Sequence, residues 1–132
     1  MQSTTVRILV VDDFELFRQF VRSIMAENRE LQIVEDASDG LEAVQKAVEL
    51  KPDLILMDIG LPSLNGIEAA RQIRKLVPES KIIFLSQESS AEVVQKAMGV
   101  GASGYVIKVM AGCELLTAVG AVLIGKRFVS SR

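Results

Sequence analysis

Five short apolar runs alternate with amphipathic helical patterns along the chain, and this alternation most strongly constrains the fold. The runs are rich in Ile, Val and Leu and mostly lack strict apolar–polar alternation, which is typical of strands buried on both faces. They lie at 6–11, 31–35, 53–57, 81–86 and 104–108. Between them, apolar residues recur at the three- and four-residue spacing of helices that bury one face. The order (βα)5 predicts an α/β domain with a parallel sheet covered by helices on both sides.

Local signals place several helix ends. Asn65 is predicted to cap the start of the third helix, and Ser89 that of the fourth, where Glu92 follows at capping-box spacing. Gly125 is predicted to end the last helix. These signals favour compact helices between the strands.

Length and charge indicate one domain that does not itself bind nucleic acid. The 132 residues suit a single core, which we assign to residues 1–125; residues 126–132 are interpreted as a short tail and the start of a linker. The formal net charge of −2 shows no basic excess. Charge-free runs such as 115–125 are about half of the ~20 residues that a membrane span needs, and the start of the chain does not resemble a signal peptide. We therefore expect a soluble cytoplasmic protein with no membrane contact.

The chain contains no histidine and a single cysteine, Cys113. The absence of histidine removes the commonest general base and excludes a Ser-His-Asp or Cys-His site within the chain. An internal disulfide is impossible, and the apolar pattern around Cys113 predicts a core position for it.

Polar side chains follow four of the five predicted strands. Asp12 and Asp13 follow the first, Asp58 the third, Ser86 ends the fourth and Lys108 ends the fifth. The carboxyl ends of parallel strands meet at one edge of the sheet, where ligands bind in open α/β folds. Three converging carboxylates would repel one another. A divalent cation relieves that repulsion, and Mg²⁺ suits hard oxygen ligands while keeping positions open for phosphate oxygens.

The remaining groups favour phosphoryl chemistry at this edge. Asp58 is a candidate nucleophile because carboxylates form aspartyl phosphates. Lys108 would supply positive charge and Ser86 a hydroxyl donor. Each residue alone has a simpler interpretation, since an Asp after a strand often makes a turn and a single Lys is usually solvated. The set, in this order along the chain, carries the specificity.

The chain resembles the receiver domain of two-component response regulators over essentially its whole length. The matching blocks, in order, are "VVDD", "LILMDIGLPSLNGIE", "IIFLS" and "GASGYVIK". The segments "LSQESS" and "ELLTAVGAVLIGKRFVSS", and the residue after Lys108, most resemble the NarL/LuxR-type subfamily. The resemblance implies a flavodoxin-like, doubly wound, five-stranded sheet of order 2-1-3-4-5. It also implies a helix-turn-helix DNA-binding domain after the receiver, which is absent here.

The same resemblance implies a role for each site residue. Asp58 would accept a phosphoryl group from a sensor histidine kinase or a small phosphodonor. Asp13, Asp58 and the backbone carbonyl of Gly60 would ligate Mg²⁺, and Asp12 would act through a bound water.

The switch residues follow from the resemblance too. Lys108 would pair with the phosphoryl oxygens, Ser86 would move toward the phosphate and Tyr105 would swing inward behind it. That would remodel the face formed by helix four, strand five and helix five. The domain would not be an enzyme, although it would assist its own phosphorylation and dephosphorylation. A homodimer is compatible with the family, and DNA would be reached only through the absent output domain.

Three positions depart from the common family pattern, and two other classes of function stay open. Val109 replaces a frequent proline, Gln87 replaces a small residue, and Gly60 offers no side chain to screen the site. Gln87 and Gly60 leave the lifetime of the phosphoryl group open.

A phosphatase or phosphotransferase using an aspartyl phosphate is one alternative, which steady turnover of a phosphomonoester would favour. A flavodoxin-like cofactor binder is the other, although the acidic first loop lacks a phosphate-cradling glycine run.

Overall fold

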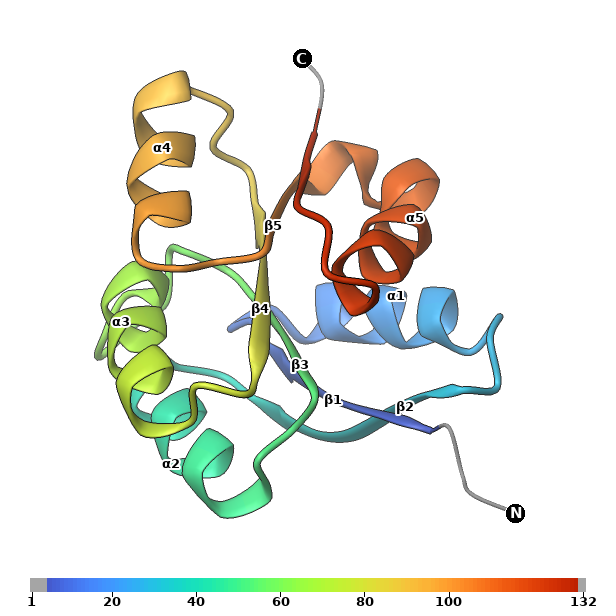
Figure 1. The fold of residues 1–132 in the computed structure, drawn as a ribbon, viewed down its shortest axis with the longest axis horizontal. Helices are drawn as coiled ribbons and strands as arrows, with labels where there is room; N and C mark the ends of the chain where they lie inside the picture. Colours follow the sequence, from blue (N-terminus) through green and yellow to red (C-terminus); the bar gives the residue numbers. More distant parts are fainter. Residues whose placement is uncertain (1–4, 131–132) are drawn as a thin grey trace.

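The computed structural model describes residues 5–130 and has three layers, with one parallel sheet between two layers of helices (Figure 1). The strands are β1 (Val6–Val11), β2 (Leu31–Ala37), β3 (Leu54–Met57), β4 (Lys81–Ser86), β5 (Gly104–Ile107) and β6 (Phe128–Val129). The helices are α1 (Glu15–Met25), α2 (Gly40–Leu50), α3 (Gly66–Leu76), α4 (Ala91–Gly99) and α5 (Ala111–Leu123). Helices α2, α3 and α4 cover one face of the sheet, and α1 and α5 cover the other.

The strand order is β2-β1-β3-β4-β5-β6, and every pair is parallel. The predicted fold class and the order of the first five strands are confirmed. The sheet also has a sixth strand that the sequence analysis did not predict. Gly104 pairs with Phe128 and Tyr105 with Val129, so part of the predicted tail lies along the edge of β5. Two residues are too few for a strand pattern to be visible in the sequence.

The central strands are buried on both faces, as their uninterrupted apolar runs predict. All four residues of β3 have no exposed surface. Ile55 and Met57 pack in the cluster under α2, α3 and α4, whereas Leu54 and Leu56 pack in the cluster under α1 and α5. Burying such a side chain contributes about 1.5–3 kcal/mol, so the two clusters fix the sheet that positions its carboxyl edge.

The helix ends agree with the sequence in part. The Asn65 side chain accepts a hydrogen bond from the Glu68 amide at the start of α3, as predicted, and Gly125 adopts a positive φ of 86° just after α5. The fourth helix is capped by Ser90 and not by Ser89, because the Ser90 hydroxyl accepts the Val93 amide. Cys113 is exposed, so the prediction of a core position was wrong.

An ion-pair cluster joins α1 to the end of β2, away from the centre of the sheet. Arg22 Nη2 lies 2.8 Å and Arg18 Nε 3.5 Å from Asp36 Oδ2. The hydrogen bond from Arg22 and the nearby positive charges lower the pKa of Asp36, although burial opposes the shift. A lowered pKa adds stability that is present above the usual pKa of an Asp and is lost as the pH falls through the folded-state pKa.

We therefore expect Asp36→Asn to destabilise the protein more at neutral than at acidic pH. The Asp36 side chain is 34% exposed, and solvent screening limits the expected cost at pH 7 to about 1 kcal/mol or less. The cost should shrink toward about pH 3, which urea unfolding at both pH values would measure. Glu68→Gln, which removes the exposed ion pair with Arg71 on α3, is the control and should have a smaller effect. An Asp36→Asn cost that grows at acidic pH would contradict this assignment.

None of the helices within residues 5–130 combines the length and apolar character that crossing a bilayer requires.

Candidate functional site

The carboxyl ends of β1, β3, β4 and β5 bring the predicted polar residues together around one cavity of about 320 Å³. The sheet register aligns the ends of the strands, since Val11 pairs with Met57 and Asp12 and Asp58 follow directly. The Asp58 amide donates to the Val11 carbonyl at 3.0 Å, so the hydrogen bonding between β1 and β3 continues to Asp58 and fixes its backbone. The cavity is lined by Asp12, Asp13, Phe14, Asp58, Gly60, Ser86, Gln87, Glu88 and Lys108.

Three carboxylates form the acidic side of the cavity. Each of Asp12, Asp13 and Asp58 offers an oxygen that lies within 4.8 Å of the others. Asp12 is 2% exposed and Asp13 is exposed. Backbone amides hold the two buried carboxylates: Phe14 N–H donates to Asp12 Oδ1 at 2.9 Å and Ile59 N–H donates to Asp58 Oδ1 at 2.8 Å. One oxygen of each of these two groups is thereby fixed, and the other faces the cavity side where Lys108 lies.

Lys108 balances the two buried carboxylates. Its Nζ lies 2.8 Å from Asp12 Oδ2 and 3.4 Å from Asp58 Oδ2, and its side chain is 14% exposed. The same ammonium lies 4.5 Å from the centre of the Phe17 ring, on α1, in a cation–π contact. These contacts hold the lysine at the acids although it follows a different strand.

Burial raises the pKa of the Asp58 carboxyl above its usual value. The Lys108 charge opposes the shift, and the negative charge of Asp12 adds to it. A charged carboxylate in such surroundings is poorly solvated. A cation that binds beside it therefore stabilises it more than it would stabilise a carboxylate exposed to water. Asp58 therefore differs from a surface acid at the end of a strand.

Ser86 and Tyr105 are linked through the loop between β4 and α4. Ser86 is 2% exposed, and its Oγ accepts a hydrogen bond from the Glu88 amide at 3.1 Å. Tyr105 has no exposed surface, and its hydroxyl donates to the Glu88 carbonyl at 2.8 Å. Its ring lies 6.4 Å from that of Phe84. Burial raises the pKa of the Tyr105 hydroxyl, which favours its neutral, donating form. The tyrosine thus occupies an inward position in this structure.

The acidic residues fit a divalent cation that prefers oxygen ligands. Within the described part of the chain, Asp12 Oδ2 is buried and accepts no hydrogen bond of suitable geometry, although it is ion-paired with Lys108. Around Gly60, no described heavy atom outside its chain neighbours lies within 4 Å of the position that a Cβ would take, so the backbone there is open. An under-satisfied buried oxygen beside two further carboxylates is a donor set suited to Mg²⁺.

Two side chains that depart from the family pattern, Val109 and Gln87, lie at the surface near the site. Val109 is 86% exposed, and residues 5–130 contain no cis peptide bond, so the Lys108–Val109 bond is trans. Gln87 is exposed and lines the cavity beside Ser86. The loop after β5 continues as a short 3₁₀ helix, Lys108–Met110, that leads directly into α5. A proline is therefore not needed to bring Lys108 to the acids.

Sequence reasoning missed several residues of the site. Phe17 supports Lys108 from α1, and Arg18 Nη1 donates to the Asp12 carbonyl at 2.6 Å. Glu88 contributes through its amide and carbonyl, which no side-chain motif could reveal. Phe17 also packs against the core cluster under α1 and α5, and its contact with the lysine leaves no separate signal in the sequence.

A flavodoxin-like parallel sheet with an acidic cluster, a serine and a lysine at its carboxyl edge defines a class of regulatory domains, the receivers. The family model described as "Response regulator receiver domain" matches residues 8–120. The chain belongs to this family, and its relatives place it among the NarL/LuxR-type receivers of two-component systems. This is a family of regulatory domains and not a classical enzyme family.

Three similar proteins illustrate the relationship. Transcriptional regulatory protein DegU of Brevibacillus brevis is 37% identical over 94% of this chain and 52% of its own length. A LuxR-family response regulator from Aurantimonas is 35% identical with a TM-score of 0.90, covering 94% of this chain and 89% of that structure. The receiver domain of the response regulator NarL from Mycobacterium tuberculosis is 27% identical with a TM-score of 0.87, covering 92% and 98%. The chain spans about half the length of the curated relatives it matches.

Receiver domains interact with sensor kinases and bind Mg²⁺ at an acidic pocket. In this chain Asp12, Asp13 and Asp58 form an acidic cluster.

Proposed function

We propose that this chain is a phosphorylation-controlled switch in which Asp58 accepts a phosphoryl group from a sensor histidine kinase. The observation that carries the proposal is the placement of Asp58, buried between the acids of β1 and the ammonium of Lys108. A carboxylate in this setting combines a nucleophilic oxygen with nearby positive charge for the incoming phosphoryl oxygens. The chain has no histidine, which fits a donor histidine on the partner.

The transfer forms one bond and breaks one bond. An Asp58 carboxylate oxygen attacks phosphorus, the P–N bond of the donor phosphohistidine breaks, and its electron pair returns to the donor imidazole. The Lys108 ammonium stabilises the negative charge on the transferred phosphoryl group, and the Ser86 hydroxyl turns toward that group. The domain thus assists its own phosphorylation and, with water as the attacking group, its dephosphorylation.

Asp13, Asp58 and the Gly60 carbonyl would hold Mg²⁺ directly, with Asp12 acting through a water. The bound cation would neutralise charge on the phosphoryl oxygens. Backbone amides orient the two carboxylates: the Ile59 amide donates to Asp58, and the Phe14 amide donates to Asp12.

The basic test is Mg²⁺-dependent phosphorylation of the purified chain by a small phosphodonor such as acetyl phosphate. Intact-protein mass should show one added phosphoryl group with Mg²⁺ and none with excess chelator. Persistent turnover of a phosphomonoester, without a stable phosphorylated protein, would instead support a phosphatase.

Asp13→Asn should weaken Mg²⁺ binding by about tenfold or more, because it removes a charged ligand from the acidic cluster. Titration calorimetry or Mg²⁺-dependent thermal stabilisation would measure the change. Glu49→Gln removes another exposed acid, on α2 and outside the cavity, and is the control. Equal weakening in both variants would show a general charge effect and not a ligand.

We infer that this receiver controls a DNA-binding domain beyond Arg132. The inference rests on the relative DegU, which is named a transcriptional regulatory protein and of whose length this chain covers 52%. Phosphorylation would shift the population between two packings of the α4–β5–α5 face, where Ser86 and Tyr105 meet the loop before α4. A homodimer, the cytoplasmic location and the boundary of the receiver at residue 125 remain predictions.

A further inference from the structure

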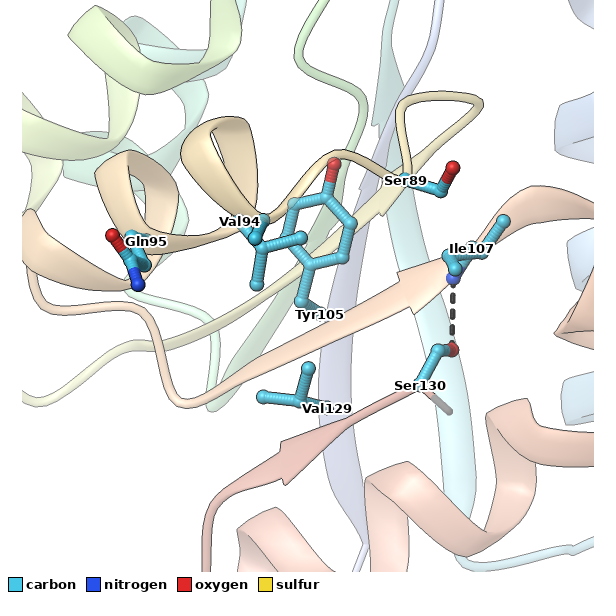
Figure 2. A pocket seen from close by; sticks show the side chains of 8 residues that line it. Ser89, Val94, Gln95, Tyr105, Ile107, Val129 and Ser130 are labelled. Carbon is cyan, nitrogen blue, oxygen red and sulfur yellow. Dashed lines mark hydrogen bonds between the residues drawn. The ribbon is translucent and has the colours of Figure 1, made fainter. Parts of the chain in front are cut away.

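Hydrogen bonds of Ser130, the residue after β6, join this strand to β5 at Tyr105 and Ile107. The Ser130 amide donates to the Tyr105 carbonyl at 2.9 Å, and the Ile107 amide donates to Ser130 Oγ at 2.9 Å. The Ser130 hydroxyl in turn donates to the Glu114 carboxylate on α5. Ser130 is 8% exposed, so these bonds are largely shielded from water. Figure 2 shows the bond from Ile107 to Ser130 across the gap between the two strands.

A cavity of about 330 Å³ lies between α4, β5 and this strand. The Tyr105 ring forms its inner wall, Val94 of α4 lies on one side and Val129 of β6 on the other (Figure 2). Tyr105 therefore sits between the helix that follows the Ser86 loop and the strand that ends the described chain. Because the ring and Val129 line the same cavity, a different packing of the ring would change the surroundings of β6.

We propose that Ser130 is a positioning residue for the Tyr105 switch, so that docking of β6 and occupation of the Asp58 pocket stabilise each other. The proposal rests on the proposed function. Ser130 contacts the backbone of β5 on both sides of Val106, at Tyr105 and at Ile107, and Lys108 follows directly. The same four-residue stretch thus carries the inward tyrosine, the strand contact and the lysine of the acidic pocket.

The coupling has a physical basis in the outer side of β5, which among the described residues is paired only with the two-residue strand β6. Without the Ser130 hydroxyl, the Ile107 amide and the Glu114 carboxylate lose a partner, while the Ser130 amide still donates to the Tyr105 carbonyl. Strand β5 is then less firmly held where Lys108 leaves it. The structure combines a docked β6 with an inward Tyr105 whose hydroxyl is bonded to Glu88. If this arrangement favours phosphoryl binding, then by linkage phosphoryl binding favours a docked β6 to the same extent. The segment beyond Arg132 would receive the signal through this strand as well as through the helical face.

The test uses beryllofluoride with Mg²⁺ as the phosphoryl mimic. Ser130→Ala should weaken mimic binding by about fivefold, and Ser130→Thr, which keeps the hydroxyl, should restore it. Thr117→Ala removes an exposed hydroxyl of α5 and should leave binding unchanged. In the wild-type chain the mimic should slow hydrogen exchange of both the Ile107 amide and the Leu56 amide in the buried β3, where the effect on Leu56 reports general stabilisation. In Ser130→Ala with saturating mimic, exchange at Leu56 should still slow, whereas the slowing at Ile107 should be reduced.

Two results would overturn the proposal in different ways. If the wild-type chain binds the mimic, while Ser130→Ala binds it equally well and shows the same slowing at Ile107, only the role of β6 fails. If the wild-type chain does not bind the mimic at all, the proposed function fails and the role of β6 fails with it.

Discussion

Asp58→Asn will abolish phosphorylation of this chain by both a phosphorylated histidine kinase and a small phosphodonor. An amide keeps the size of the side chain but lacks the negative oxygen that attacks phosphorus, so covalent transfer should fall to background. Intact-protein mass or a phosphate-affinity gel would measure the loss. The variant should fold, since burial already opposes the charged form of Asp58 in the metal-free protein.

Asp39→Asn provides the matched control for this substitution. Asp39 caps the start of α2, where its side chain accepts the Glu42 amide, and asparagine is an equally good cap. The chemical change is the same, but the residue lies outside the acidic cavity, so phosphorylation should be unaffected. Persistent labelling of the Asp58→Asn protein would show that the phosphoryl group is carried elsewhere.

Lys108→Gln should have two effects of opposite sign. Phosphorylation should slow by about 100-fold or more, because the ammonium that meets the transferred charge is gone. Mg²⁺ should bind more tightly, because the same ammonium lies 2.8 Å from Asp12 and 3.4 Å from Asp58 and competes for their oxygens. Phosphorylation rates at saturating Mg²⁺ and a separate Mg²⁺ titration would resolve the two effects.

Lys75→Gln, an exposed lysine of α3, serves as the control for net charge. It should change neither quantity appreciably. Weaker Mg²⁺ binding in Lys108→Gln would contradict the competition and would indicate that the lysine supports the metal site.

The sequence predicted the fold class and most of the residues that line the acidic cavity, because both depend on patterns that are local in the chain. Runs buried on both faces indicate a parallel sheet, and its carboxyl edge then gathers whatever follows each strand. The sequence alone therefore predicts that four side chains lie side by side at this edge: Asp12, Asp58, Ser86 and Lys108. The family resemblance, and not the spacing, supplied their separate roles.

The features that sequence missed depend on contacts between distant parts of the chain. Strand β6 is two residues long and is defined by its partner β5, and not by a pattern of its own. The contribution of Glu88 comes from its backbone, and the pairing of Phe17 with Lys108 joins α1 to the end of β5. The wrong cap at Ser89 was an error of one position, which is common at helix ends because neighbouring serines offer the same chemistry.

The acidic cavity draws its residues from four strands that are joined by long helical crossovers. Asp12 and Lys108 are far apart in the sequence, but their charged groups are in contact. They meet because β1, β3, β4 and β5 are paired side by side in one sheet. A fragment that ends before β5 lacks the lysine, which follows that strand, and a chain with an unassembled sheet does not bring it to the acids. Under the proposed function, phosphorylation of Asp58 would therefore require a completely folded sheet. An unfinished or misfolded copy would not be phosphorylated and would not transmit a false signal.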